Sequence, residues 1–306
     1  MPLNVDDLEF PVMQIVTQRA GPFSDDLARH LSHALGANDS TRRSSSCVVY
    51  MLARAPLARD ALHAVCREHD VDSAIIQTPR PLSAFKLLVF DMDSTLINIE
   101  CIDELADLVG KKQEVAALTE RAMQNRDVDY DTSLRMRTRL LAGLSVARFD
   151  DLYAQRLQIT PGAAALVKTA KMAGLKTAIV SGGFDYFTGR VRAELGVDED
   201  YSNHLEVVAG KLTGELLGTL INADVKARRV QALCLDLGIP TSDAIVVGDG
   251  ANDLKMMALA GLSVGYRAKP VVRAAVDVNI ERLGLDSLLT VFDAQAAPGI
   301  SGVEPR

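Results

Sequence analysis

The pattern of apolar positions changes near residue 80 of this chain. Before that point, short runs that favour β-strands are separated by amphipathic stretches. The clearest strand runs are PVMQIVTQ (11–18), SSCVVYML (45–52) and DSAIIQ (72–77). Leucines recur every four residues between Ser24, a candidate helix N-cap, and Gly36, a candidate stop, and residues 57–70 predict a second helix. We interpret residues 1–84 as a small α+β unit of order βαββαβ that ends in a proline-containing linker at 78–83.

After the linker, the strand runs become almost continuously apolar. They are FKLLVF (85–90), KTAIV (176–180) and AIVVG (244–248). Such runs are typical of parallel strands that are covered on both faces. Helical stretches lie between them, and this alternation predicts an α/β domain with a doubly wound parallel sheet over residues 85–293.

One interval of this domain, at about 101–160, lacks a convincing strand. It holds three or four amphipathic helical stretches, including EVAALTERAM and TSLRMRTRLLAGL. We interpret the interval as a helical cap inserted after the first strand. A β-hairpin is expected around HLEVVAGKLTGEL, with its turn at Ala209-Gly210. The tail at 294–306 is rich in small and polar residues, and we predict it to be flexible.

Composition narrows the classes of function. The 306-residue chain has a net charge of −7, so it has no general attraction for nucleic acid or for an anionic membrane. No apolar run approaches the roughly 20 residues that a membrane span needs. The N-terminus has no signal pattern, and we predict a cytoplasmic protein. The four cysteines are far apart and contain no CxxC pair, which indicates buried free thiols rather than a zinc site or disulfides.

Small polar and acidic residues follow each of the three apolar runs. They are Asp91-Met92-Asp93-Ser94-Thr95, Ser181-Gly182-Gly183 and Asp249-Gly250-Ala251-Asn252-Asp253. Any one of these groups is compatible with an ordinary turn. Ligands of doubly wound folds, however, bind beyond the carboxyl ends of the strands. Three such groups at one edge therefore predict a shared site.

The acidic residues at this edge predict a metal. Asp91, Asp93 and Asp249 would repel one another unless a cation lay between them, and oxygen ligands with room for water suit Mg²⁺. The metal would offset the charge of an anionic nucleophile and a phosphate. Lys226 lies near the start of a predicted helix. A lone lysine there is usually solvated, but the acidic strand ends favour a functional role.

The motifs DMDSTLI (91–97), VSGG (180–183), Lys226 and GDGAND (248–253) resemble the four motifs of the haloacid dehalogenase superfamily. The resemblance covers about residues 85–290. Within the superfamily, the sequence is most similar to the phosphoserine phosphatases. The stretches that carry this similarity are DMDSTLINIECIDELA, SLRMR, VSGGF and VGDGAND.

The resemblance implies a role for each motif residue. Asp91 would attack phosphorus and form an aspartyl phosphate, and Asp93 would serve as general acid and then as general base. Ser181 and Lys226 would hold phosphate oxygens. Gly182 and Asn252 would help to bind the phosphate. Asp91, Asp249 and the Asp93 carbonyl would ligate Mg²⁺. Asp253 would orient Lys226 or a metal-bound water.

The resemblance also implies a phosphorylated amino acid, O-phospho-L-serine, as the substrate, in the last step of serine biosynthesis. Arg137 would bind its carboxylate and Glu100 its ammonium, a matched pair of charges for an amino acid. Met123 and Tyr130 fall at cap positions near the substrate, where Tyr130 replaces the Phe expected in the family.

Other interpretations remain open at this stage. Phosphatases of other small phosphoesters, and enzymes that pass the phosphoryl group to an amino alcohol, share the four motifs. A receiver-type signalling module also carries a phosphorylated Asp, although the cap and Asp93 argue against it. The N-terminal unit resembles ACT-type regulatory domains, and it would either bind a regulatory amino acid or serve stability or the formation of a homodimer.

Overall fold

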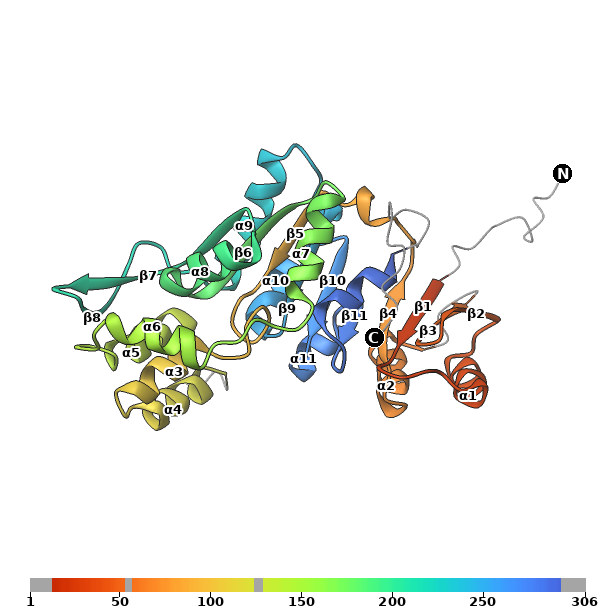
Figure 1. Ribbon diagram of the computed structural model, residues 1–306, viewed down its shortest axis with the longest axis horizontal. Helices are drawn as coiled ribbons and strands as arrows, with labels where there is room; N and C mark the ends of the chain where they lie inside the picture. Colours follow the sequence, from red (N-terminus) through yellow and green to blue (C-terminus); the bar gives the residue numbers. More distant parts are fainter. Residues whose placement is uncertain (1–12, 53–56, 124–128, 293–306) are drawn as a thin grey trace.

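The computed structural model describes residues 13–52, 57–123 and 129–292, without the side chains of Ala122 and Met123. Figure 1 shows an elongated arrangement, with the N-terminal unit at one end, a group of helices at the other and a sheet between them. The predicted flexible tail at 294–306 lies outside the described residues.

The N-terminal unit has the predicted βαββαβ order. Its elements are β1 (Met13–Gln18), α1 (Asp25–Leu35), β2 (Asp39–Ser44), β3 (Cys47–Leu52), α2 (Arg59–Glu68) and β4 (Asp72–Ile76). Ser24 caps α1 by accepting a hydrogen bond from the Leu27 N–H, and Gly36 ends it in the left-handed conformation, as predicted. The position of β2 is not marked by an apolar run, because this exposed edge strand has the sequence DSTRRS and buries few side chains.

The predicted catalytic part, which runs from residue 85 to the end of the described residues, is a doubly wound α/β unit, and this confirms the predicted fold class. Its elements are β5 (Leu87–Phe90), α7 (Ala163–Met172), β6 (Lys176–Phe184), α8 (Asp185–Leu195), β7 (Glu199–Val208), β8 (Lys211–Leu217), α9 (Ala223–Asp236), β9 (Ala244–Gly248), α10 (Leu254–Met257), β10 (Leu262–Tyr266), α11 (Pro270–Arg273) and β11 (Val278–Ile280). Neighbouring strands from β11 to β7 are parallel, and β8 is antiparallel to β7.

The described strands form one continuous sheet across both units. Their order is β2-β3-β1-β4-β11-β10-β9-β5-β6-β7-β8. The junction is the antiparallel pair β4–β11, where Ala74 lies opposite Val278. Next to this pair, the buried carboxylate of Asp72 accepts backbone hydrogen bonds from Glu281 at 3.0 Å and from Leu283 at 2.9 Å. The N-terminal unit is therefore joined to the catalytic part by backbone pairing as well as by side chains.

His63 on α2 belongs to the same junction. Its side chain is only 2% exposed, and its Nε2 lies 3.1 Å from the Val276 carbonyl of the catalytic part. Because a carbonyl only accepts, Nε2 carries the proton, and Nδ1 accepts from the Ser73 hydroxyl at 2.7 Å. Burial lowers the pKa of His63 to about 4, so the ring is neutral at pH 7.

Alternate residues of the central strands pack into two different cores. Leu88 and Phe90 of β5 contribute to the core that includes α7 and α8, whereas Leu87 and Val89 contribute to the core that includes α9, α10 and α11. A third core lies between α1, α2 and one face of the N-terminal strands. Coverage on both faces explains why these strands read as unbroken apolar runs.

Four helices form the cap between β5 and α7 in the described part of that interval. They are α3 (Cys101–Leu108), α4 (Lys112–Met123), α5 (Tyr130–Arg139) and α6 (Ala147–Gln155). The predicted hairpin is confirmed as β7–β8, with its turn at Ala209 and Gly210. It contacts the cap through hydrogen bonds from Gly143 N to Leu212 O and from Val146 N to Gly210 O. The hairpin therefore braces the cap against the sheet.

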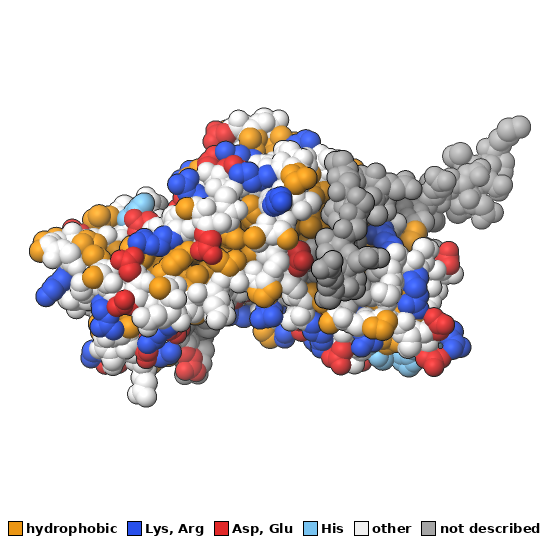
Figure 2. All heavy atoms as spheres, in the orientation of Figure 1, with side chains coloured by type: hydrophobic (Ala, Val, Ile, Leu, Met, Phe, Trp, Pro, Cys, Tyr) orange, Lys and Arg blue, Asp and Glu red, His pale blue; other side chains and the backbone are white. Residues whose placement is uncertain are grey.

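The surface seen in Figure 2 carries acidic and basic side chains interspersed rather than gathered by sign. Among the described residues, no helix is long and apolar enough to cross a membrane. All four cysteines are free and buried, as predicted.

Candidate active site

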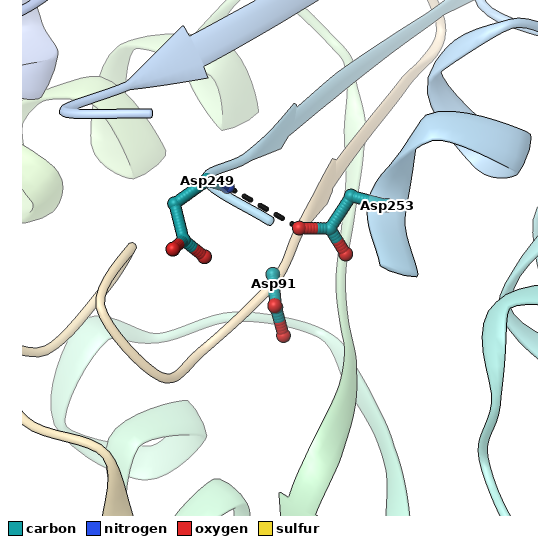
Figure 3. A group of neighbouring side chains, drawn as sticks. All are labelled: Asp91, Asp249 and Asp253. Atoms are coloured by element: carbon teal, nitrogen blue, oxygen red, sulfur yellow. Dashed lines mark hydrogen bonds between the residues drawn. The ribbon is translucent and has the colours of Figure 1, made fainter. Parts of the chain in front are cut away.

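Two acidic residues meet at the carboxyl ends of neighbouring strands. Asp91 directly follows β5, and its backbone N–H donates to the Val247 carbonyl of β9 at 2.9 Å. Asp249 directly follows β9. Both side chains are buried, at 4% and 5% exposure. Because β5 and β9 are parallel neighbours, their ends bring the two carboxylates to one place, together with Asp253 (Figure 3).

Lys226 is fully buried within this acidic group. Its Nζ lies 2.9 Å from Asp91 Oδ1 and 2.8 Å from Asp253 Oδ1. The other Asp253 oxygen accepts the backbone N–H groups of Asp249 at 3.2 Å and Gly250 at 3.1 Å. Asp253 therefore holds both the lysine and the loop that carries Asp249. These contacts exclude a solvated surface lysine.

The electrostatics of the group show an excess of negative charge. Burial, followed by the nearby Asp91 carboxylate, raises the pKa of Asp249 to about 6 and that of Asp253 to about 7. Although burial opposes the charged form of Lys226, the carboxylates of Asp253 and Asp91 raise its pKa above the ordinary value. One oxygen from each of the three aspartates lies within 4.8 Å of the others. A buried carboxylate cluster of this kind suits a hard cation.

A tight turn after β5 brings Asp93 back to the same edge. The N–H groups of Thr95 and Leu96 both donate to the Met92 carbonyl, and Ser94 adopts a positive φ of 57°. The Oδ1 atom of Asp93 is buried and has no hydrogen-bond partner among the described residues. Burial, followed by the Glu100 and Asp91 carboxylates, raises the pKa of Asp93 well above its ordinary value.

Ser181, Gly182 and Gly183 lie inside β6 rather than after it, which corrects the sequence-based expectation. The β6–β7 pairing moves from Val180 opposite Tyr201 to Phe184 opposite Asn203, so three residues of β6 span one residue of β7. This irregularity directs the segment toward the site. Ser181 is fully buried and accepts the Gly183 N–H at 2.9 Å.

Neighbouring side chains lie so close to the backbone of this segment that glycine is favoured at both positions. A Cβ on Gly183 would lie 3.1 Å from Asp93 Oδ2 and 3.2 Å from Ser181 Oγ. A Cβ on Gly182 would lie 2.5 Å from the hydroxyl oxygen of Tyr130, which comes from the cap. The cap therefore contacts the Ser181–Gly183 segment directly.

The predicted substrate-binding charges lie in and beside the cap. Arg137 on α5 is only 8% exposed, and no carboxylate of the described residues lies within 4.0 Å of its guanidinium. Its hydrogen bonds, to Ser133 O at 3.4 Å and Thr119 Oγ1 at 3.3 Å, are long. Glu100 precedes α3 and accepts the Ser94 hydroxyl at 2.9 Å. Within the described part of the chain, Arg137 is thus a buried cation that forms no direct ion pair.

The remaining predicted residues lie less centrally. Met123 ends α4, and its side chain is outside the described part of the structure. Asn252 lies against Gly250, where an added Cβ would overlap its Oδ1. Tyr130 begins α5, and burial raises its pKa to about 12 although Lys226 and Arg137 act in the opposite direction. The structure therefore brings Tyr130 within electrostatic reach of both cations.

Three site features were not predicted. Lys269 Nζ lies 3.4 Å from Asp249 Oδ2, and its N–H donates to the Asp249 carbonyl. Asn222 caps α9 through its Oδ1, and its Nδ2 donates to Asp131 Oδ1 of the cap at 3.0 Å. Asn203 contacts Gly182 in β6 and Ile221 just before α9. Only Lys269 could have been predicted from the sequence, because it lies shortly after the apolar run LSVGY, which marks a fourth strand end.

Comparison with known proteins agrees with this geometry. The profile of the haloacid dehalogenase-like hydrolases matches residues 88–258. A phosphoserine phosphatase from Polaromonas sp. strain JS666 is 54% identical over 212 residues, which cover 68% of this chain and 90% of that protein. A HAD family hydrolase from Salmonella enterica serovar Typhi has a TM-score of 0.81 at 29% identity, over 93% of this chain and 99% of that chain. A probable phosphoserine phosphatase from Vibrio cholerae has a TM-score of 0.76 at 35% identity, over 93% of this chain and 87% of that chain. The structural likeness therefore extends beyond the part that the family profile matches.

Proposed function

Because this chain belongs to the haloacid dehalogenase-like hydrolases, we propose that it hydrolyses O-phospho-L-serine to L-serine and phosphate. One observation carries the proposal. A buried nucleophile-and-lysine cluster, Asp91 with Lys226, lies beneath a cap that presents Arg137, a buried cation that forms no ion pair with the described residues. The first part suits a phosphate and the second suits a carboxylate, and phosphoserine carries both groups.

The chemistry follows from the two acidic residues after β5. An oxygen of Asp91 attacks phosphorus and forms an aspartyl phosphate, while the bond from phosphorus to the serine oxygen breaks. Asp93, whose raised pKa keeps a proton available, donates that proton to the leaving serine oxygen. Asp93 then accepts a proton from water as the water attacks phosphorus, and Asp91 is released. Lys226 and Ser181 hold the phosphate oxygens throughout.

A divalent cation fits the acidic cluster. We assign Mg²⁺ to the carboxylates of Asp91 and Asp249 and to the Asp93 carbonyl, because both Asp253 oxygens already accept hydrogen bonds. When bound, the cation supplies positive charge that offsets the repulsion between the nucleophile and the phosphate. Asp253 then acts by holding Lys226 and the Asp249 loop in place.

The cap supplies recognition of the amino acid. Arg137 binds the substrate carboxylate, and Glu100 binds the ammonium group. Burial raises the pKa of Glu100 above its ordinary value, and a cationic substrate group beside it would favour its charged form. Tyr130, Met123, Gly182 and Asn252 complete the pocket. Closure of the cap would exclude water from the aspartyl phosphate.

The division of the chain also forms part of the proposal. Residues 1–84 form an ACT-like unit with its linker, 85–293 form the catalytic unit and 294–306 a tail. The N-terminal unit either binds a regulatory amino acid or holds two copies of the chain together. Sedimentation of the protein with and without L-serine separates these roles. The cytoplasmic location stays a prediction.

The test is a substrate panel. Phosphate release would be measured from L-phosphoserine, phosphothreonine and an aryl phosphate, with and without Mg²⁺, for the wild type and Asp91→Asn. We expect a clear preference for phosphoserine, dependence on Mg²⁺ and loss of turnover in the variant. Equal rates on all substrates would indicate a phosphatase of other small phosphoesters. Labelling of the protein without turnover would instead indicate a signalling module.

A further inference from the structure

Asn203 on β7 bridges two segments of the site, one inside β6 and one just before α9. Its side chain is only 1% exposed. The Nδ2 group donates to the Gly182 carbonyl at 2.8 Å, and Oδ1 accepts the Ile221 N–H at 2.9 Å. The buried side-chain amide of Asn203 therefore hydrogen-bonds to the backbone of both Gly182 and Ile221, which lie 39 positions apart in the chain.

The need for the first of these bonds follows from the irregularity in β6. Between Val180 and Phe184, the regular β6–β7 pairing is interrupted. The partly buried Gly182 carbonyl lies in this interval, and a carbonyl shielded from water is costly to leave without a partner. The side chain of Asn203 supplies the donor that the ladder does not. The amide thus holds the segment that carries Ser181 in its displaced position.

The second bond acts on the approach to α9. Ile221 directly precedes Asn222, the N-cap of this helix, and the Lys226 N–H makes the first helical bond to the Asn222 carbonyl at 2.8 Å. Ile221 O also lies close to Gly182, 3.6 Å from the position of an added Cβ. A displacement of Ile221 would therefore shift the start of the helix that carries Lys226.

We propose that Asn203 is a positioning residue that sets the distance between Ser181 and Lys226, the two groups that hold phosphate in the proposed function. Asn203 itself does not reach the phosphate. Its amide ties the β6 segment to the start of α9, so that both phosphate-binding groups are held in register before a substrate arrives. The proposal rests on the proposed function only in assigning phosphate to this pair.

Asn203→Asp is the most direct variant. It keeps the shape and the acceptor for Ile221 but replaces the donor to Gly182 with an oxygen. The matched control is Asn279→Asp on β11, because Asn279 is also buried, at 5% exposure, and its Nδ2 donates to the Arg273 carbonyl at 2.9 Å. Inorganic phosphate would be titrated calorimetrically into each Mg²⁺-loaded protein, and thermal unfolding would be followed in parallel.

Loss of a buried hydrogen bond of this kind corresponds to a weakening of phosphate binding by about 10- to 100-fold. We expect this loss in Asn203→Asp, whereas Asn279→Asp should bind phosphate within about twofold of the wild type although it is also destabilised. Equal phosphate affinity in both variants would overturn the positioning role and leave Asn203 a structural residue. If Asn203→Asp does not fold, Asn203→Ser is compared with Asn279→Ser in the same way.

This readout is independent of the substrate. Inorganic phosphate binding does not require turnover, so the positioning role is tested even if phosphoserine is not hydrolysed. If the wild type binds phosphate, Asn203→Asp weakens that binding, and the wild type releases no phosphate from phosphoserine, then the proposed substrate alone is refuted. Wild-type turnover of phosphoserine with an unaffected Asn203→Asp would refute the positioning role alone.

Discussion

Gly182→Ala tests the contact between the cap and the phosphate-binding segment. An added Cβ would lie 2.5 Å from the Tyr130 hydroxyl oxygen, whereas ordinary contacts begin at 3.4 Å. The next atoms, Ile221 O at 3.6 Å and Tyr130 Cζ at 3.7 Å, lie at ordinary distances. The hydroxyl oxygen must therefore retreat by about 0.9 Å, and it alone causes the overlap.

The expected cost follows from overpacking. Inserting a methyl group into a packed site costs about 1–3 kcal/mol. Tyr130 is the first residue of α5 and can move with the cap, so we expect the lower part of this range. About 1–2 kcal/mol corresponds to a loss of about 5- to 30-fold in kcat/KM. Because the cap is pushed away from the phosphate, most of the loss should appear in KM.

The assay is a double-mutant cycle on phosphoserine hydrolysis. Tyr130→Phe removes the overlapping atom, so the double variant should regain most of the activity that Gly182→Ala loses. Gly189→Ala is the matched control, because an added Cβ there has no neighbour within 4 Å. Unchanged KM in Gly182→Ala, or no recovery in the double variant, would refute the inferred contact.

Two further predictions concern the contact between the cap and α9 and the junction of the two units. Asn222→Asp keeps the N-cap of α9 but places a second carboxylate beside Asp131, so we expect KM to rise by about 5- to 30-fold. Adding Asp131→Asn to this variant should restore KM. A double variant that is no better than Asn222→Asp would contradict the contact. His63 gains its proton near pH 6.5 when unfolded but only near 4 when folded, so its stabilising effect is complete above 6.5 and lost as pH falls toward 4. Urea unfolding at pH 7 and 4.5 should show the wild type losing about 2–3 kcal/mol more than His63→Gln, and equal losses would argue against a buried neutral ring.

The parts of this fold that could be predicted are those with local signals. The continuous apolar run before Asp91 and the acidic turn after it identified the central strand and its chemical edge. Cap residues such as Arg137 were found through resemblance, because a charged residue on an amphipathic helix looks the same whether it is solvated or buried. The edge strand β2 belonged to the predicted order, but its position was not assigned because its side chains bury almost nothing.

Other features depend on tertiary structure alone. The position of Ser181 within β6 reflects a change in strand register, and neither residue type nor spacing encodes such a change. Asn203 and Asn222 are ordinary polar residues in the sequence, and their partners Gly182, Ile221 and Asp131 lie 18 to 91 positions away. Lys269 could have been predicted, since it lies shortly after the apolar run of β10, a fourth strand whose carboxyl end meets the same edge of the sheet.

The central claim is that Asp91 carries the phosphoryl group during turnover. The most direct measurement is acid quenching of the protein during turnover of phosphoserine with Mg²⁺, followed by mass spectrometry of its peptides. We predict one added phosphoryl group on the peptide that contains Asp91, and none without Mg²⁺ or in Asp91→Asn. A phosphoryl group on a different residue, or turnover in Asp91→Asn at the wild-type rate, would contradict it.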